Sequence, residues 1–188
     1  MRRLLPDPGP TTVSEQLQTY RPWEEEREGR PFVAVNFAAT LDGRATIGGV
    51  SGPIGSDTDT AMLAGLRKRF DAVMIGAGTM RAERYAGLEQ RLIVVESHEG
   101  KWTDPVDLLG SLGEEGVRAV MCEGGPTLHG SLQAAGLVDE LFLTIAPKLS
   151  GGDAAPRIVE GPLSDVVGLE LVWLLEEQGE LFARYRRS

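Results

Sequence analysis

Apolar runs alternate with amphipathic segments through most of the chain. Phe32 to Ala38 is apolar on both faces apart from Asn36, as expected for a strand that is covered on both sides. The same reasoning predicts strands at residues 71–75, 91–95, 117–122 and 140–146. Two further strands, at 169–176 and 180–187, flank Gln178-Gly179, a pair that indicates a hairpin.

Helices are predicted between the strands. Ser56 is a suitable N-cap, and Asp57 and Asp59 fall in the first turn of a helix that runs to about Phe70. Its apolar stripe contains Met62, Leu63 and Leu66. Shorter helices are predicted at 13–20, from the Gly76 turn to about residue 84, at 108–114, and from Pro126 to about 136.

The order of these elements predicts one α/β domain. Its sheet is mixed and mostly parallel, flanked by helices, with antiparallel strands at the C-terminal end. We place this domain at 31–188, after a proline-rich and then charged N-terminal arm at 1–30. The arm either packs on the domain or a partner subunit, or is a poorly ordered tail. The glycine-rich segment 45–55 is predicted to be a functional loop.

Composition narrows the class of protein. The 188 residues are 41% hydrophobic and 25% charged, which suits a compact globular chain. The formal net charge of −9 disfavours binding to nucleic acid. The single cysteine excludes an internal disulfide and is consistent with a cytoplasmic location. We expect no signal peptide and no membrane span, because no apolar run is long enough.

Two strand–glycine–helix turns carry the main chemical signal. They are Gly76-Ala77-Gly78-Thr79 and Glu123-Gly124-Gly125-Pro126-Thr127. Free backbone N–H groups at a helix start, next to glycine, favour a phosphate group. The alternative is that the glycines only make tight turns, since Arg81 stands where a full dinucleotide fingerprint has its last glycine.

Three charged residues have two interpretations each. Glu123 either orients a substrate and handles a proton, or complements the dipole of the helix that follows. Asp42, in Thr40-Leu41-Asp42-Gly43, is either a catalytic carboxylate or a turn residue. Arg67 either complements the C-terminal end of its helix or, on the face it shares with Leu63, holds an anion.

Cys122 raises a rival hypothesis of a cysteine hydrolase. A nucleophile at the end of a strand would use His98 or His129 as its base. The nucleophile elbow needs a glycine two residues earlier, where this chain has Val120, so a buried structural cysteine is the competing interpretation. No spacing of histidine, cysteine and carboxylate suggests a metal site.

Taken in order, these motifs resemble the reductase domain of bacterial riboflavin-biosynthesis deaminase–reductases, which has a dihydrofolate-reductase-like fold. The matching elements lie at roughly 32–152: Thr40 to Gly43, Ser51, Leu66-Arg67, Asp71 to Val73, Gly76 to Thr79, Cys122 to Thr127, Val138 to Leu141, and Ala146 to Lys148. We therefore expect a stand-alone reductase without the zinc deaminase domain of the bifunctional enzymes.

The resemblance implies an NADPH-dependent reduction of 5-amino-6-(5-phosphoribosylamino)uracil to its ribitylamino form. It implies a homodimer, with Ser51, Arg67 and Glu123 on the substrate and Arg67 pairing with its phosphate. Glu123 and Asp42 become the candidate catalytic residues. The implied cofactor contacts are Ala38, Thr40, Gly76, Gly78, Thr79, Glu83, Ser97, Gly124, Gly125, Pro126, Thr127 and Leu128.

One departure from the family leaves the substrate open. The family often has Ala-Asp-Asp-Pro and then Leu-Thr-Val-Arg, which clamps the substrate, where this chain has Ala82-Glu83-Arg84-Tyr85-Ala86-Gly87-Leu88. Arg84 and Arg91 are the candidates to replace the clamp, and Arg81 and Arg84 those for the 2′-phosphate of NADP. A dihydrofolate- or pterin-type reductase and a non-catalytic nucleotide-binding module are the alternatives.

Overall fold

The computed structural model describes residues 1–83, 85, 87–98, 101–102, 104–152, 155–161, 163 and 165–188. The helices are α1 (Val13–Leu17), η1 (Pro22–Glu24), α2 (Asp57–Arg67), α3 (Ala77–Ala82), α4 (Pro105–Glu114) and α5 (Pro126–Ala134). The strands are β1 (Arg2–Leu5), β2 (Gly9–Pro10), β3 (Phe32–Thr40), β4 (Ala72–Gly76), β5 (Arg91–Val95), β6 (Ser97–His98), β7 (Lys101–Trp102), β8 (Ala119–Cys122), β9 (Glu140–Ala146), β10 (Leu169–Glu177) and β11 (Glu180–Arg187).

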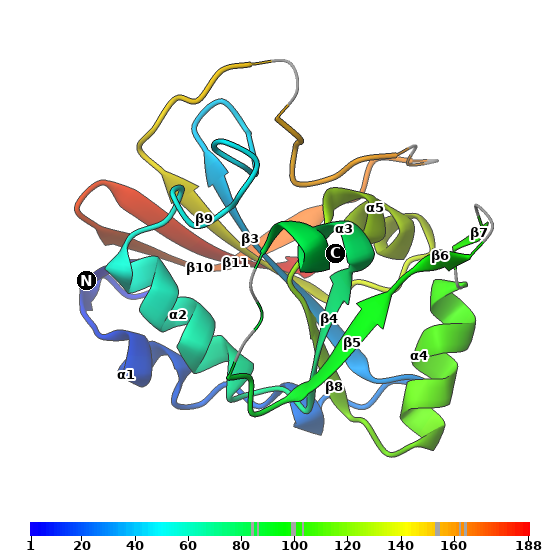
Figure 1. The fold of residues 1–188 in the computed structure, drawn as a ribbon. Helices are drawn as coiled ribbons and strands as arrows, with labels where there is room; N and C mark the ends of the chain where they lie inside the picture. The colour runs from blue at the N-terminus through cyan, green and yellow to red at the C-terminus, as the bar shows by residue number, and fades with distance from the viewer. Residues whose placement is uncertain are drawn as a thin grey trace.

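The main sheet has the order β2-β1-β10-β11-β9-β3-β8-β4-β5 (Figure 1). Strands β9, β3, β8, β4 and β5 are parallel, whereas β11, β10, β1 and β2 continue the sheet with antiparallel pairing. The predicted mixed sheet with antiparallel C-terminal strands is therefore confirmed. Strands β6 and β7 pair separately.

Strand β3 lies in the middle of the sheet and is buried on both faces, as its apolar sequence predicts. Its residues 32 and 34 pack against α1 and α2, whereas 33, 35 and 37 pack against α4 and α5. Figure 1 shows these two pairs of helices on opposite sides of the sheet. Among the helices that the structure describes, none has the length and apolar composition that crossing a bilayer requires.

The N-terminal segment packs on the domain, which is the first of the two expectations for residues 1–30. Strand β1 pairs with β10, from Arg2 opposite Glu176 onward. Thr12 and Glu15 form a capping box at the start of α1, and Leu17 is buried. The sequence did not predict β1 or β2, because both are short and lack an alternating apolar pattern.

A buried carboxylate joins this segment to the C-terminal hairpin. The side chain of Glu140 is fully buried, and it accepts two hydrogen bonds from Arg184, at 2.9 and 2.6 Å. Arg186 donates to the same carboxylate at 3.0 Å, and the hydroxyl of Tyr20 donates at 3.0 Å. Burial is the main cause that raises the pKa of Tyr20, so the phenol remains a donor.

We expect the Glu140→Gln substitution to lower the free energy of unfolding by about 3–5 kcal/mol, because it removes the fully buried charge that pairs with the partly buried Arg184. The matched control is Glu115→Gln, which removes the exposed partner of Arg91 and should cost about 0–1 kcal/mol. Urea denaturation followed by circular dichroism measures both. Equal losses in the two variants would contradict this account of the buried pair.

Candidate functional site

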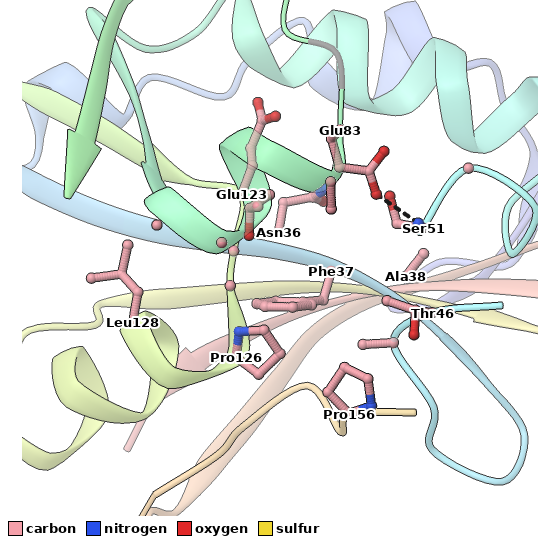
Figure 2. Close-up of a pocket in the computed structure, with 18 of the residues that line it drawn as sticks. Asn36, Phe37, Ala38, Thr46, Ser51, Glu83, Glu123, Pro126, Leu128 and Pro156 are labelled. Carbon is pink, nitrogen blue, oxygen red and sulfur yellow. Dashed lines mark hydrogen bonds between the residues drawn. The ribbon is translucent and has the colours of Figure 1, made fainter. Parts of the chain in front are cut away.

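A cavity of about 460 Å³ opens beside the carboxyl ends of β3, β4 and β8. Figure 2 shows that its walls come from different elements: Phe37 and Ala38 from β3, Thr46 and Ser51 from the loop before α2, and Pro126 and Leu128 from α5. The predicted site residues that line it are Ala38, Ser51, Arg67, Gly76, Gly78, Thr79, Glu83, Glu123, Gly124, Gly125, Pro126, Thr127 and Leu128.

The two glycine turns meet at the cavity wall. The backbone N–H of Gly76 donates to the carbonyl of Gly124 at 2.8 Å, and that of Glu123 donates to the carbonyl of Met74 at 3.0 Å. A Cβ atom on Gly125 would lie 3.0 Å from the Thr79 hydroxyl oxygen. The backbones of the turns therefore approach as closely as glycine permits, and the peptide bond between Gly124 and Gly125 is cis.

Two helices begin at this meeting point without a side-chain cap. Helices α1, α2 and α4 are capped by Thr12, Ser56 and Asp104. Helices α3 and α5 start after Gly76 and Gly125, and within the described residues no side chain caps them. Because uncapped N–H groups carry partial positive charge, the cavity wall suits the phosphates of a dinucleotide.

Arg67 and Glu123 form a bidentate ion pair at the cavity. Arg67 donates from Nε and Nη2 to the two carboxylate oxygens, at 2.7 and 2.6 Å. The Glu123 side chain is only 4% exposed, whereas that of Arg67 is 26% exposed. Hydrogen bonding to Glu123 is the main cause that raises the pKa of Arg67. The pair uses two of the five guanidinium N–H groups, so Arg67 retains donors for an anion.

Tyr85 packs against this ion pair. The guanidinium carbon of Arg67 lies 5.7 Å from the centre of the Tyr85 ring, within reach of a cation–π interaction. Burial, and then the charge of Glu123, raise the pKa of Tyr85, so its hydroxyl stays protonated. Tyr85 belongs to the segment where the family clamp is missing, and sequence reasoning did not select it.

Asp59 is a second carboxylate on the cavity wall. The hydroxyl of Thr144, on β9, donates to its Oδ1 at 2.6 Å. Burial raises the pKa of Asp59, and the Thr144 hydroxyl opposes that shift. The sequence indicated only an acidic residue in the first turn of α2, because the register that brings Thr144 against it is a tertiary feature.

Glu83 joins the glycine-rich loop to the end of α3. Its carboxylate accepts a hydrogen bond from the backbone N–H of Ser51 at 2.7 Å (Figure 2). Both residues line the cavity. In this structure the predicted cofactor residue Glu83 therefore positions the predicted substrate loop.

Two predicted site residues lie outside the cavity lining: Thr40 and Asp42. The Asp42 carboxylate accepts hydrogen bonds from the Thr40 hydroxyl at 2.6 Å and from the backbone N–H groups of Ser150 and Gly151. These bonds, that of Thr40 foremost, lower the pKa of Asp42 to about 2. This geometry fits the turn interpretation of Asp42.

Of the two candidates to replace the clamp arginine, the structure describes Arg91 but not Arg84. Arg91 begins β5, opposite Ala72 at the start of β4, and pairs with Glu115. It lies at the edge of the sheet away from Gly76, so it does not replace the clamp arginine. Arg84 lies outside the described residues, and Ser97 is described only by its backbone in β6.

The cysteine-hydrolase hypothesis is corrected by burial. Cys122 is fully buried, and burial raises the pKa of its thiol to about 12. His129 is also buried; its Nδ1–H donates to the carbonyl of Ile158 at 2.8 Å, and its Nε2 accepts from the Gln133 amide at 3.0 Å. Burial lowers the pKa of His129. Burial therefore makes both Cys122 and His129 unsuitable for this chemistry, whereas the side chain of His98 lies outside the described part of the structure.

Several lining residues were not predicted from the sequence: Asn36, Phe37, Ala45, Thr46, Gly49, Gly52, Asp59, Thr60, Leu63, Ala82, Tyr85 and Pro156. Asn36 carried a signal, as the polar residue in an otherwise apolar strand. Leu63 and Arg67 carried another, because residues four apart on a helix share a face. The remainder depend on the path of loops.

A family model described as the RibD C-terminal domain matches residues 31–102 and 86–177. A 2,5-diamino-6-ribosylamino-4(3H)-pyrimidinone 5′-phosphate reductase of Methanothermobacter thermautotrophicus is 28% identical over an alignment of 198 positions. The alignment covers 76% of this chain and 91% of that protein. The riboflavin biosynthesis protein RibD of Bacillus amyloliquefaciens is also 28% identical, but the match covers 50% of its length.

Solved structures share the fold at low sequence identity. A pyrimidine reductase-like protein from Corynebacterium diphtheriae is 20% identical with a TM-score of 0.74, over 95% of this chain and 99% of that chain. The riboflavin biosynthesis reductase Rib7 of Saccharomyces cerevisiae is 20% identical with a TM-score of 0.68, over 94% of this chain and 99% of that chain. These likenesses bear on the fold alone.

We expect native protein at pH 8 to resist alkylation by iodoacetamide, because buried Cys122 stays a thiol. Mass spectrometry checks this, with urea-unfolded protein as the positive control. We also expect Cys122→Ala to retain whatever activity the chain has. Loss of activity in a folded Cys122→Ala variant would restore the hydrolase hypothesis.

Proposed function

The chain belongs to the RibD C-terminal domain family, and we propose that it is an NADPH-dependent reductase of a riboflavin-pathway pyrimidine. The substrate would be 5-amino-6-(5-phosphoribosylamino)uracil or its 2-amino counterpart, and the product would carry a ribitylamino group. The observation that carries the proposal is the pair of uncapped helix starts at the cavity.

The residues present fit NADPH. Its phosphates would lie against the N-termini of α3 and α5, which the close contact between the Gly76 and Gly125 turns holds side by side. Thr79 and Thr127 would add hydroxyl donors, and Ala38 and Leu128 apolar contacts. Of the two candidates for contact with the 2′-phosphate, Arg81 is exposed on α3, and Arg84 lies outside the described residues. When bound, the nicotinamide supplies a hydride for C1′ of the substrate's ribose.

The substrate would occupy the side of the cavity formed by α2. Arg67, with its free N–H groups, would pair with the substrate phosphate, and Glu123 fixes the orientation of the guanidinium. Leu63 and Phe37 would exclude water from the reacting carbon. Tyr85, held against Arg67, would serve where the clamp arginine is missing.

The names of the relatives support two candidate substrates. The Methanothermobacter protein is named for the 2,5-diamino pyrimidinone, and a Buchnera aphidicola protein, 36% identical over 63 residues, for the uracil form. The two molecules differ at C2, which carries an amino group in one and an oxygen in the other. Both present the ribosylamino group whose reduction we propose.

The test is NADPH oxidation at 340 nm with each pyrimidine, and with NADH and dihydrofolate for comparison. We expect turnover of a pyrimidine substrate with NADPH. Glu123→Gln and Arg67→Lys should each lower kcat/KM by about 10- to 100-fold, since each loses a charged bidentate contact. The matched controls are Glu115→Gln and Arg91→Lys, from the exposed pair at the other edge of the sheet.

If only dihydrofolate were turned over, the chain would be a dihydrofolate- or pterin-type reductase and not a reductase of the riboflavin-pathway pyrimidine. Binding of NADPH, measured by fluorescence, without turnover of any substrate would leave only a nucleotide-binding module. If the Arg67 and Glu123 variants matched their controls, the assignment of the site would be wrong.

We also propose that the chain forms a homodimer and that it is cytoplasmic, a location with which its single cysteine is consistent. The dimer is supported by an apolar groove away from the cavity, lined by residues that include Leu141, Leu163, Val166, Val167 and Leu169. Val166 is 98% exposed, and such apolar exposure is typical of a surface that a partner covers.

Sedimentation velocity should therefore give twice the monomer mass. Val166→Asp should shift the protein toward monomer, because it buries a charge in the interface. The control is Val106→Asp, at a half-exposed valine on α4. A monomer at all concentrations would refute the proposal.

A further inference from the structure

Asp59 differs from the other acidic residues at the cavity. Glu123 has Arg67 as its counter-charge, and Glu83 accepts a backbone N–H. Within the described part of the chain, no cation forms an ion pair with Asp59. A carboxylate that is taken from water without a counter-charge costs free energy unless a ligand compensates it.

The surroundings of Asp59 increase that cost. Glu180 is buried nearby, accepts a hydrogen bond from the Ser56 hydroxyl, and its pKa is raised by burial and then by the charge of Asp59. Lys148 lowers the pKa of Glu180, but its amino group donates to the carbonyls of Pro53 and Ile54. Asp59 therefore faces the cavity with its charge uncompensated.

The carboxylate is nevertheless oriented. The Thr144 hydroxyl holds Oδ1, and the other oxygen, Oδ2, packs beside Gly55, where a Cβ atom would collide with it. Each carboxylate oxygen accepts two hydrogen bonds, so this arrangement leaves an acceptor on both oxygens. A ligand with two parallel N–H groups would match it, as a guanidinium matches a carboxylate.

Asp59 also stands at a suitable distance from Arg67. Residues 59, 63 and 67 follow the four-residue spacing of one helix face, and all three line the cavity. Eight residues of α-helix span about 12 Å. That length is comparable with the span of a pyrimidine ribose phosphate from the ring edge to the phosphate.

The two candidate substrates present different ring edges to such a group. A 2-aminopyrimidin-4-one offers N3–H and a 2-amino N–H side by side, which are two donors for two carboxylate oxygens. A uracil offers N3–H flanked by carbonyl oxygens, so one carboxylate oxygen would face another acceptor. An unpaired polar contact of this kind is the strongest source of discrimination between similar substrates.

We propose that Asp59 binds the N3–H and 2-amino edge of the pyrimidine and makes this chain select the 2,5-diamino pyrimidinone over its deaminated uracil counterpart. The inference rests on the proposed reductase function and assigns its substrate class. It also places the reaction before the hydrolytic deamination that replaces the 2-amino group with oxygen.

The test compares kcat/KM for the two pyrimidines with NADPH at pH 7. We expect the wild-type chain to favour the 2-amino substrate by at least about tenfold. Asp59→Asn should lower that ratio by at least about tenfold, because the amide NH₂ faces the C2 carbonyl of uracil favourably. The affinity for NADPH should not change.

Two further variants separate ring recognition from a structural role. Asp57→Asn, in the same helical turn but exposed and outside the cavity lining, should leave the ratio and both kcat/KM values unchanged. Thr144→Val keeps the carboxylate but removes the hydroxyl that orients it, so it should lower the ratio to a value between wild type and Asp59→Asn.

The outcomes are distinct. Turnover of both pyrimidines with a wild-type ratio near one, or in favour of uracil, overturns the inference and leaves the reductase function standing, and this measurement needs no variant to fold. An unchanged ratio in Asp59→Asn likewise overturns it. Turnover of neither pyrimidine overturns the reductase function and, with it, this inference.

Discussion

The close approach of two backbone turns is the constraint on which the cavity depends. Strands β4 and β8 are neighbours in the sheet, with Met74 opposite Cys122, so the turns that follow them must meet. They meet through the hydrogen bond from Gly76 to Gly124 and the contact of Gly125 with Thr79. Side chains would separate the turns, and with them the two helix starts that form one wall.

The charge distribution around this wall is local. The chain carries a formal net charge of −9, which repels phosphate at long range. At the cavity, the helix starts and Arg67 supply positive potential, whereas Asp59 supplies an acceptor that has no counter-charge among the residues the structure describes. A ligand with a phosphate at one end and N–H donors at the other would complement both.

The sequence predicted the parts of the fold that periodicity and turn chemistry determine. The buried strand β3, the Ser56 cap of α2 and both glycine turns are where the pattern placed them. Strands β1 and β2 were missed because β1 pairs with β10, at the other end of the chain, and β2 pairs only with β1. Short edge strands carry no local signal that would reveal such a partner.

In the candidate site, the residues of local turns were predicted, whereas the contacts between distant residues were not. Residues in the glycine turns were found, because a mechanism links glycine and helix starts to anions. The pairing of Arg67 with Glu123 was not, since the two are 56 positions apart. The sequence placed Asp59 only in the first turn of a helix and offered Asp42 as a candidate catalyst. It carried no signal for the hydrogen bonds that Thr144 donates to Asp59 and Ser150 donates to Asp42, because both are tertiary contacts.

The strand order has a consequence for how the chain acquires its structure. Strand β3 can pair with its parallel neighbours only after residues 119–122 and 140–146 have been synthesised, and β1 can pair with β10 only after β10 has been synthesised. Such long sequence separations slow folding, because the entropy of loop closure is lost before the distant contacts contribute favourable free energy. During synthesis on the ribosome, the apolar β3 would emerge long before its cover. Exposed apolar segments and unpaired strand edges of this kind favour aggregation until their partners are in place.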